Sequence, residues 1–264
     1  AMLDPDEKIL TPQPGFAYYP MSARYHHGSA NTYPLSKDDG FVQRPAAILE
    51  HYDGERMIYL TSPHNPTGST IAPGAIADIA DAVEEHTLVV VDEAYGEFTA
   101  VPSAVDLLDS HDNVAILRTF SKAYGLAGLR VGYAIVPEAW AGAYARVNTP
   151  FASGEVSCRA ALAALDDEAF VAETVESARE MRSHIHEHLS APTWESEGNF
   201  VLAEVGNAEA VTQAAQREGV IVRDCSSFGL PGCLRISCGT EAETETAVAT
   251  LNDILAEREI HQHE

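Results

Sequence analysis

The sequence predicts an α/β protein with a mostly parallel sheet and helices on both faces, followed by a small C-terminal α+β domain. Apolar β-branched runs such as residues 87–91 (TLVVV) alternate with amphipathic segments such as residues 73–86. This alternation is typical of buried parallel strands joined by helices. The pattern changes near residue 190, where short strands and two helices indicate a second unit. We therefore expect an α/β domain over residues 1–150, connecting helices over 151–189 and the small domain over 190–264.

Taken in order, the first 150 residues contain the strands of the predicted parallel sheet. A loop rich in proline and aromatic residues, residues 12–28, is expected to be irregular after the first strand. Residues 73–86 begin with proline and have apolar positions at helical spacing, which predicts a helix. The expected strands are residues 8–13, 57–61, 87–91, 112–119 and 131–136.

The last 120 residues predict helices first and then a mixed unit. Helices are expected at residues 140–147, 157–165 and 169–189. In the small domain, strands are expected at residues 200–205, 220–224 and 233–237, and helices at 208–218 and 241–258. Gly219 ends the first of these two helices, as glycine commonly does.

The chain is strongly acidic, and this restricts its partners. It has 264 residues, a formal net charge of -24 and a pI of about 4.6. Such a surface repels nucleic acid and anionic membranes, so neither is expected as a partner. Acidic residues spread along the whole chain, together with few lysines, indicate a salt-adapted protein from a halophilic source.

Several classes of site are excluded by spacing. The four cysteines (158, 225, 233 and 238) contain no C-x-x-C pair, so no zinc site or disulfide framework is expected. His184 and His188 share a helix face without a carboxylate partner, and we predict no metal site. No apolar run reaches membrane length and no signal peptide opens the chain, which favours a cytoplasmic protein.

Residues 117–132, LRTFSKAYGLAGLRVG, contain the clearest chemical signal. Lys122 is one of only three lysines, and it lies among small residues that let a ligand approach the backbone. Thr119, Ser121 and Arg130 offer two hydroxyls and a guanidinium to a phosphate. An amine that is partly removed from water beside a second cation loses its proton more easily and attacks carbonyl carbons. This combination indicates a Schiff-base lysine with a phosphate clamp, as used to hold pyridoxal phosphate.

The stretch T-F-S-K-A-Y-G-L-A-G-L-R resembles the lysine segment of fold-type I pyridoxal-phosphate aminotransferases. The subgroup it resembles most contains histidinol-phosphate aminotransferase. The resemblance implies the cofactor pyridoxal 5'-phosphate and small-molecule amino acid and 2-oxo acid substrates, histidinol-phosphate-like or aromatic. It also implies a homodimer.

The resemblance assigns roles to further residues. Asp92, at the carboxyl end of a predicted parallel strand, is implied to hold the pyridine nitrogen protonated. Asn65, in the N-P-T-G sequence, and Tyr95 are implied to donate to the 3'-oxygen of the cofactor. Phe16 is implied to stack on the pyridine ring. Arg235 is implied to bind the substrate carboxylate, and Asn199 to line the substrate site. Lys122, Asp92 and Tyr95 are the expected catalytic residues.

Three alternatives remain open at this point. A decarboxylase or lyase of the same fold would use the same cofactor residues. The relatives also have an N-terminal piece before the first residue here, which supplies part of the phosphate site. We therefore expect that the chain starts inside a domain, and a truncated, non-catalytic binding or dimerisation module is the second alternative. A nucleotide-binding protein, the third, is disfavoured because no G-x-G-x-x-G or G-K-[ST] loop is present.

Overall fold

The computed structural model describes residues 3–147 and 152–262, with side chains described to Arg146 in the first range and to Glu257 in the second. Its larger sheet has six strands in the order β2-β1-β3-β4-β5-β6. All neighbouring strands are parallel except β6, which is antiparallel to β5 at one edge. The strands are β1 (Lys8–Gln13), β2 (Ser29–Pro34), β3 (Met57–Thr61), β4 (Leu88–Asp92), β5 (Val114–Thr119) and β6 (Gly132–Ile135).

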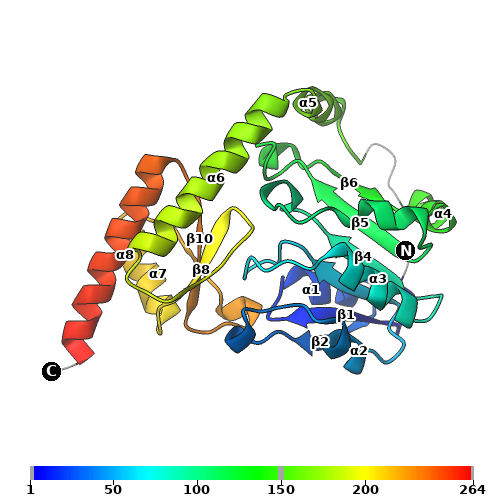
Figure 1. Cartoon of the computed structure of the whole chain (residues 1–264), viewed down its shortest axis with the longest axis horizontal. Helices are drawn as coiled ribbons and strands as arrows, with labels where there is room; N and C mark the ends of the chain where they lie inside the picture. Colours follow the sequence, from blue (N-terminus) through cyan, green and yellow to red (C-terminus); the bar gives the residue numbers. More distant parts are fainter. Residues whose placement is uncertain (1–2, 148–151, 263–264) are drawn as a thin grey trace.

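Helices cover both faces of this sheet, as predicted (Figure 1). Successive side chains of a strand point to opposite faces, so Val90 of β4 packs on one face while Val89 and Val91 pack on the other. The first face is covered by α1 (Tyr18–Tyr25) and α4 (Glu138–Val147). The second face is covered by α2 (Pro45–Glu50) and α3 (Pro73–Ala82). The predicted fold class is therefore confirmed.

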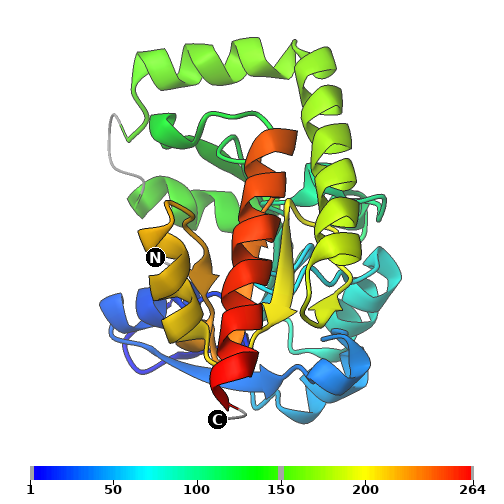
Figure 2. The same ribbon diagram turned by 90° about the vertical axis from the view of Figure 1, so that its left-hand side faces the viewer.

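The second unit is built on a small antiparallel sheet in the order β7-β8-β10-β9. Its helices pack on one face and bury a separate apolar core that includes Ile185, Val211 and Leu251. Figure 2 shows α8 crossing this side of the molecule. The elements are α5 (Glu155–Leu165), α6 (Glu168–His188), β7 (Thr193–Trp194), β8 (Phe200–Glu204), α7 (Ala208–Arg217), β9 (Arg223–Asp224), β10 (Cys233–Ser237) and α8 (Glu241–Gln262).

The two sheets are joined by shared apolar packing as well as by the chain. Phe228 and Cys233 belong to the same buried cluster as Ile58 and Val91 of the larger sheet. Trp194 packs edge-on against Phe41, with the ring centroids 5.4 Å apart. This packing fixes the second unit beside the carboxyl ends of the parallel strands. The predicted domain boundary between residues 150 and 151 lies outside the described residues.

The predicted loop over residues 12–28 is wrong in part, because it contains helix α1. Pro20 is the third residue of this helix, where the backbone N–H has no intrahelical acceptor, so a proline is tolerated there. Tyr19 and Ala23 lie one turn apart and are both buried. Because of this proline, the sequence pattern predicts a loop where an amphipathic helix forms.

Three other boundaries differ from the prediction by three residues or more. Helix α3 ends at Ala82 rather than His86, because Val83 is extended and the N–H of Glu84 donates to the hydroxyl of Tyr52. Strand β9 has only two residues, since only Arg223 and Asp224 pair with β10. Helix α8 continues to Gln262. Within the described part of the chain, no helix is both long and apolar enough to cross a bilayer.

A buried histidine supports the loop after β3. The His64 side chain is fully buried, and its Nδ1 lies 2.7 Å from the hydroxyl of Thr67. Burial lowers the pKa of His64 to about 3. The ring is therefore neutral in the folded protein and becomes protonated near its ordinary pKa only on unfolding.

We expect this histidine to make the fold less stable in acid. Because the unfolded state binds a proton that the folded state does not, the free energy of unfolding falls as the pH drops below about 6.5. The slope of the free energy of unfolding that is due to His64 approaches about 1.4 kcal/mol per pH unit. Denaturant titrations between pH 7 and 5 should show a flatter pH dependence for His64→Asn. The same replacement at the exposed His51 is the control, and an unchanged slope in His64→Asn would contradict the prediction.

Candidate active site

The predicted catalytic residues meet at the carboxyl ends of β3, β4 and β5. Thr61 of β3 pairs in register with Asp92 of β4, and Asp92 pairs with Leu117 of β5. The loop after β5 carries Lys122. The carboxyl edge of a parallel sheet is where α/β proteins place ligands, and the second unit packs over this edge.

Asp92 is held by two hydrogen bonds from opposite sides. The hydroxyl of Tyr19 donates to Oδ2 at 2.7 Å, and the N–H of Ala94 donates to Oδ1 at 3.0 Å. Burial raises the pKa of Asp92, while both hydrogen bonds and the nearby charge of Lys122 oppose this shift. Burial beside Asp92 also raises the pKa of Tyr19 well above its ordinary value, so Tyr19 remains a neutral donor.

The amine of Lys122 lies on the face of an aromatic ring. Its Nζ is 5.1 Å from the ring centroid of Tyr95, a cation–π distance. The Tyr95 ring is 5% exposed and packs edge-on against Phe200, with centroids 5.0 Å apart. Ala178 of helix α6 belongs to the same buried apolar cluster as these two rings. Tyr95 therefore belongs to a rigid wall next to the lysine.

A contact between the two units orients the amide of Asn65. Nη1 of Arg235, on β10, donates to Oδ1 of Asn65 at 2.6 Å. The amide oxygen thus accepts this bond, and the amide nitrogen makes no hydrogen bond to any of the described residues, so it can donate to a ligand. Nε of Arg235 is buried and has no partner among the described residues. An unpartnered buried guanidinium donor is expected where an anionic ligand binds.

These side chains line one cavity of about 290 Å³. Phe16 lies at its wall with 37% of the residue exposed, and its ring packs edge-on against Tyr19. The wall also contains residues that the sequence did not single out, among them Arg223 and Phe228. The predicted residues at this cavity are Phe16, Asn65, Asp92, Tyr95, Lys122 and Arg235.

The remaining predicted residues lie elsewhere. Asn199 lines a separate cavity of about 370 Å³ that also contacts Lys122. Thr119, Ser121 and Arg130 line neither cavity. Thr119 Oγ1 accepts from the N–H of Ser121 at 3.1 Å, and the exposed Arg130 donates to the carbonyl of Ala127. The phosphate clamp formed by these three residues stays a prediction.

A larger groove elsewhere on the molecule does not share this chemistry. It holds about 410 Å³ over the sheet face near α1 and α4, and its lining is mostly apolar. None of the predicted site residues lines it. The cavity beside Lys122 is therefore the candidate site.

Sequence reasoning missed Tyr19 and Arg118. Tyr19 lies in the stretch that the sequence predicts to be an irregular loop, although its spacing of three from Phe16 would place both on one helical face. Arg118 donates to Glu93, the residue after Asp92, through Nη2 at 2.6 Å. No local sequence signal pairs a strand arginine with a glutamate 25 residues away.

The polar and aromatic groups that line the cavity match the groups of pyridoxal phosphate. Asp92 offers a half-buried carboxylate to a ring cation, and the amide nitrogen of Asn65 offers a donor to a ring oxygen. Phe16 presents an aromatic face, and Lys122 supplies the amine that would bind the aldehyde. The unpartnered Nε of Arg235 suits the anionic group of a substrate.

Comparisons with known proteins agree with this chemistry. The model of the family described as aminotransferase class I and II matches residues 1–251. Histidinol-phosphate aminotransferase of Haloferax volcanii is 69% identical over 257 residues, covering 97% of this chain and 71% of that protein. The enzyme of that name from Natronomonas pharaonis is 63% identical, covering 97% and 72%. These relatives from halophilic archaea agree with the predicted halophilic character.

A solved structure shares the fold. The crystal structure of histidinol-phosphate aminotransferase from Sinorhizobium meliloti, in complex with pyridoxal-5'-phosphate, matches with a TM-score of 0.84 and 28% identity. The match covers 97% of this chain and 72% of that one.

The contact between Tyr19 and Asp92 can be tested directly. Removing the donor in Tyr19→Phe should raise the pKa of Asp92 further, because the hydrogen bond stabilises the carboxylate. Carbon-13 NMR titration of side-chain carboxyls would measure this, with the resonance assigned by Asp92→Asn. Tyr59→Phe is the matched control, since the Tyr59 hydroxyl contacts Met57 instead. A pKa of Asp92 that stays unchanged or falls in Tyr19→Phe would rule out this role.

Proposed function

Because the chain belongs to the aminotransferase class I and II family, we propose that this pyridoxal-phosphate-dependent aminotransferase moves an amino group between histidinol phosphate and a 2-oxo acid. The observation that carries the substrate proposal is the 69% identity, over 97% of the chain, to a histidinol-phosphate aminotransferase. Aminotransferases of this family use amino acid and 2-oxo acid substrates. Membership therefore favours an aminotransferase over a decarboxylase, a lyase or a non-catalytic module.

The charges at the cavity suit both substrates. Histidinol phosphate carries a phosphate ester where an amino acid carries its α-carboxylate, so one pocket must accept either anion. Arg235 and Arg223 both line the cavity, and either anion can accept from the Arg235 guanidinium. A phosphate has more charge and more acceptor oxygens than a carboxylate, so it also engages Arg223. We assign Arg223 to discrimination in favour of the phosphate substrate.

The cofactor is held from several sides in this proposal. Asp92 pairs with the ring nitrogen, and Asn65 and Tyr95 donate to the ring oxygen. Phe16 stacks on the ring face, and the phosphate clamp of Thr119, Ser121 and Arg130 contributes to phosphate binding. The bond from Arg235 fixes which end of the Asn65 amide faces the ring, because the guanidinium can only donate.

The chain's own residues then carry out the proton movements. When bound, pyridoxal phosphate supplies an aldehyde that links to amines and a ring that accepts the electron pair released at the substrate Cα. Nζ of Lys122 would take the proton from the substrate Cα as a base and give it up again as an acid. The hydrogen bonds from Tyr19 and Ala94 to the two oxygens of Asp92 favour its ionised form. Asn199, at the cavity on the other side of Lys122, contributes to the substrate site.

We further propose a cytoplasmic homodimer. The family is typically dimeric, which supports the assembly. All four cysteines are free thiols, and burial raises the pKa of Cys225 to about 12 and that of Cys238 to about 12. Buried, protonated thiols are compatible with a reducing compartment.

The role of Lys122 predicts a single site of covalent attachment. Borohydride reduction in the presence of pyridoxal phosphate should fix the cofactor on Lys122, and peptide mass spectrometry would locate it. The chain has only two other lysines, Lys8 and Lys37. The variants Lys8→Arg and Lys37→Arg are therefore controls for every other lysine, and both should keep the adduct. Lys122→Ala should carry none. An adduct that persists in Lys122→Ala, or is absent from the parent protein, would refute the assignment.

The substrate proposal predicts an asymmetric effect of Arg223. Arg223→Gln should raise the KM for histidinol phosphate roughly 10-fold through the loss of a charged hydrogen bond at an exposed position. The KM for glutamate in the same enzyme should change much less. Arg217→Gln, on the last turn of α7, is the charge-matched control. Equal changes for both substrates would contradict the role of Arg223, and an enzyme inactive with histidinol phosphate would refute the substrate itself.

A further inference from the structure

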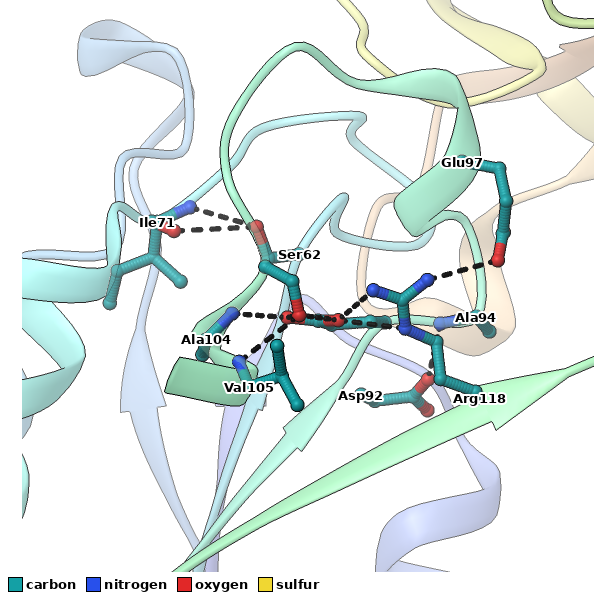
Figure 3. A network of polar contacts seen from close by, with 10 residues as sticks. Ser62, Ile71, Asp92, Ala94, Glu97, Ala104, Val105 and Arg118 are labelled. Atoms are coloured by element: carbon teal, nitrogen blue, oxygen red, sulfur yellow. Dashed lines mark hydrogen bonds and ion pairs between the residues drawn. The ribbon is translucent and has the colours of Figure 1, made fainter. Parts of the chain in front are cut away.

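An ion-pair network lies directly behind the candidate site. Arg118, on β5, donates to Glu93 through Nη2 at 2.6 Å and through Nε at 2.8 Å, and to Glu97 through Nη1 at 3.0 Å (Figure 3). The Glu93 residue is 3% exposed, and its carboxylate also accepts from the hydroxyl of Ser103 and the N–H of Ala104. A single guanidinium thus binds two carboxylates from one short segment.

That segment is the turn that carries Tyr95. Glu93 stands two residues before Tyr95 and Glu97 stands two residues after it. The turn is closed by hydrogen bonds from Gly96 to the carbonyl of Glu93 and from Phe98 to the carbonyl of Tyr95. A Cβ built on Gly96 would lie 3.4 Å from the guanidinium carbon of Arg118, so Arg118 lies against the turn itself.

The network connects three catalytic candidates through short stretches of backbone. Glu93 follows Asp92, and its N–H donates to the carbonyl of Leu117, the residue before Arg118. Arg118 precedes Lys122 by four residues on the same strand and loop. A displacement of the turn would change the position of Tyr95 relative to Lys122, whose Nζ lies 5.1 Å from the Tyr95 ring centroid.

The network is poorly explained by stability alone. Buried ion pairs cost desolvation energy and are often no more stabilising than apolar side chains of similar size. Burial raises the pKa of Glu97 although Arg118 is close, and Oε2 of Glu97 is buried without a partner among the described residues. The turn that carries Tyr95 therefore holds a buried carboxylate oxygen without a partner among the described residues, which costs stability and favours a positional role for the network.

We propose that Arg118 is a positioning residue that holds Tyr95 against Lys122 by binding both ends of the Tyr95 turn, Glu93 and Glu97. The inference rests on the role proposed above for Tyr95, and it does not depend on which amino donor the enzyme uses. The forked guanidinium matters because it binds two carboxylates in one plane, whereas a lysine ammonium is a single point charge.

The first measurement needs no cofactor. In hydrogen–deuterium exchange of the apoprotein, Arg118→Leu should speed exchange in the peptide containing Gly96 and Phe98 by about 10-fold or more, because their closing hydrogen bonds open more often. Arg118→Lys should give an intermediate rate, since it keeps the charge without the fork. Arg159→Leu, in an exposed pair with Glu155, is the control and should leave this peptide unchanged.

The second measurement is the pH titration of the absorbance band that the cofactor forms with Lys122. Tyr95 stabilises an anionic ring oxygen and so keeps the pKa of this chromophore low. Arg118→Leu should raise that pKa by about one unit, and the same substitution in a Tyr95→Phe background should add almost nothing. This loss of additivity separates positioning of Tyr95 from a general loss of stability.

The outcomes are distinct. Faster exchange in the turn together with a non-additive pKa shift supports the proposal. Additive shifts in the two backgrounds, or a lower melting temperature with an unchanged chromophore pKa, overturn it. If Arg118→Leu does not fold, Glu97→Gln is the second variant, because it removes the charge of only one of the two carboxylates that Arg118 binds. It should speed exchange in the turn and raise the chromophore pKa by smaller amounts than Arg118→Leu. An exchange rate and a chromophore pKa that both equal those of the parent protein would overturn the proposal. Absence of any chromophore in the parent enzyme would instead refute the role of Lys122.

Discussion

The structure depends on the register of three parallel strands. Because Thr61, Asp92 and Leu117 are neighbours across β3, β4 and β5, the loops that follow these strands begin at one edge of the sheet. Backbone hydrogen bonds from Ser62 to Asp92 and from Glu93 to Leu117 continue the pairing one residue past the strands. The loops that carry Asn65, Tyr95 and Lys122 therefore start from paired backbone at one edge of the sheet.

Burial of charge at this edge is compensated from several directions. Asp92 accepts hydrogen bonds from Tyr19 and Ala94, and the adjacent Glu93 accepts from Arg118, Ser103 and Ala104. A half-buried and a buried carboxylate on neighbouring residues would otherwise repel each other and raise each other's pKa. Pairing Glu93 with an arginine leaves Asp92 as the carboxylate that faces the cavity.

Much of this arrangement follows from the sequence. Hydrophobic runs predict the parallel strands, and Asn65, Asp92 and Lys122 each follow one of these runs, so the sequence alone predicts that they lie at one edge of the sheet. Helix α1 was missed because Pro20 and its neighbours have the composition of a loop, although proline is acceptable in a first turn. The Arg118 network was missed because its partners are close only after β4 and β5 pair. The separate position of Asn199 depends on how α6 packs against β8, which no local pattern encodes.

The second unit completes the site as well as covering it. Arg235 on β10 binds Asn65 in a loop of the larger sheet, 170 residues earlier in the chain. The bond requires the apolar packing that joins the units, including Phe228 and Cys233 against the core of the larger sheet. The same guanidinium keeps a buried Nε without a partner among the described residues, and the amide of Asn65 keeps its nitrogen free. In the proposed site, any loss of packing between the units would therefore affect the donor to the cofactor, Asn65, and the donor to the substrate, Arg235, together.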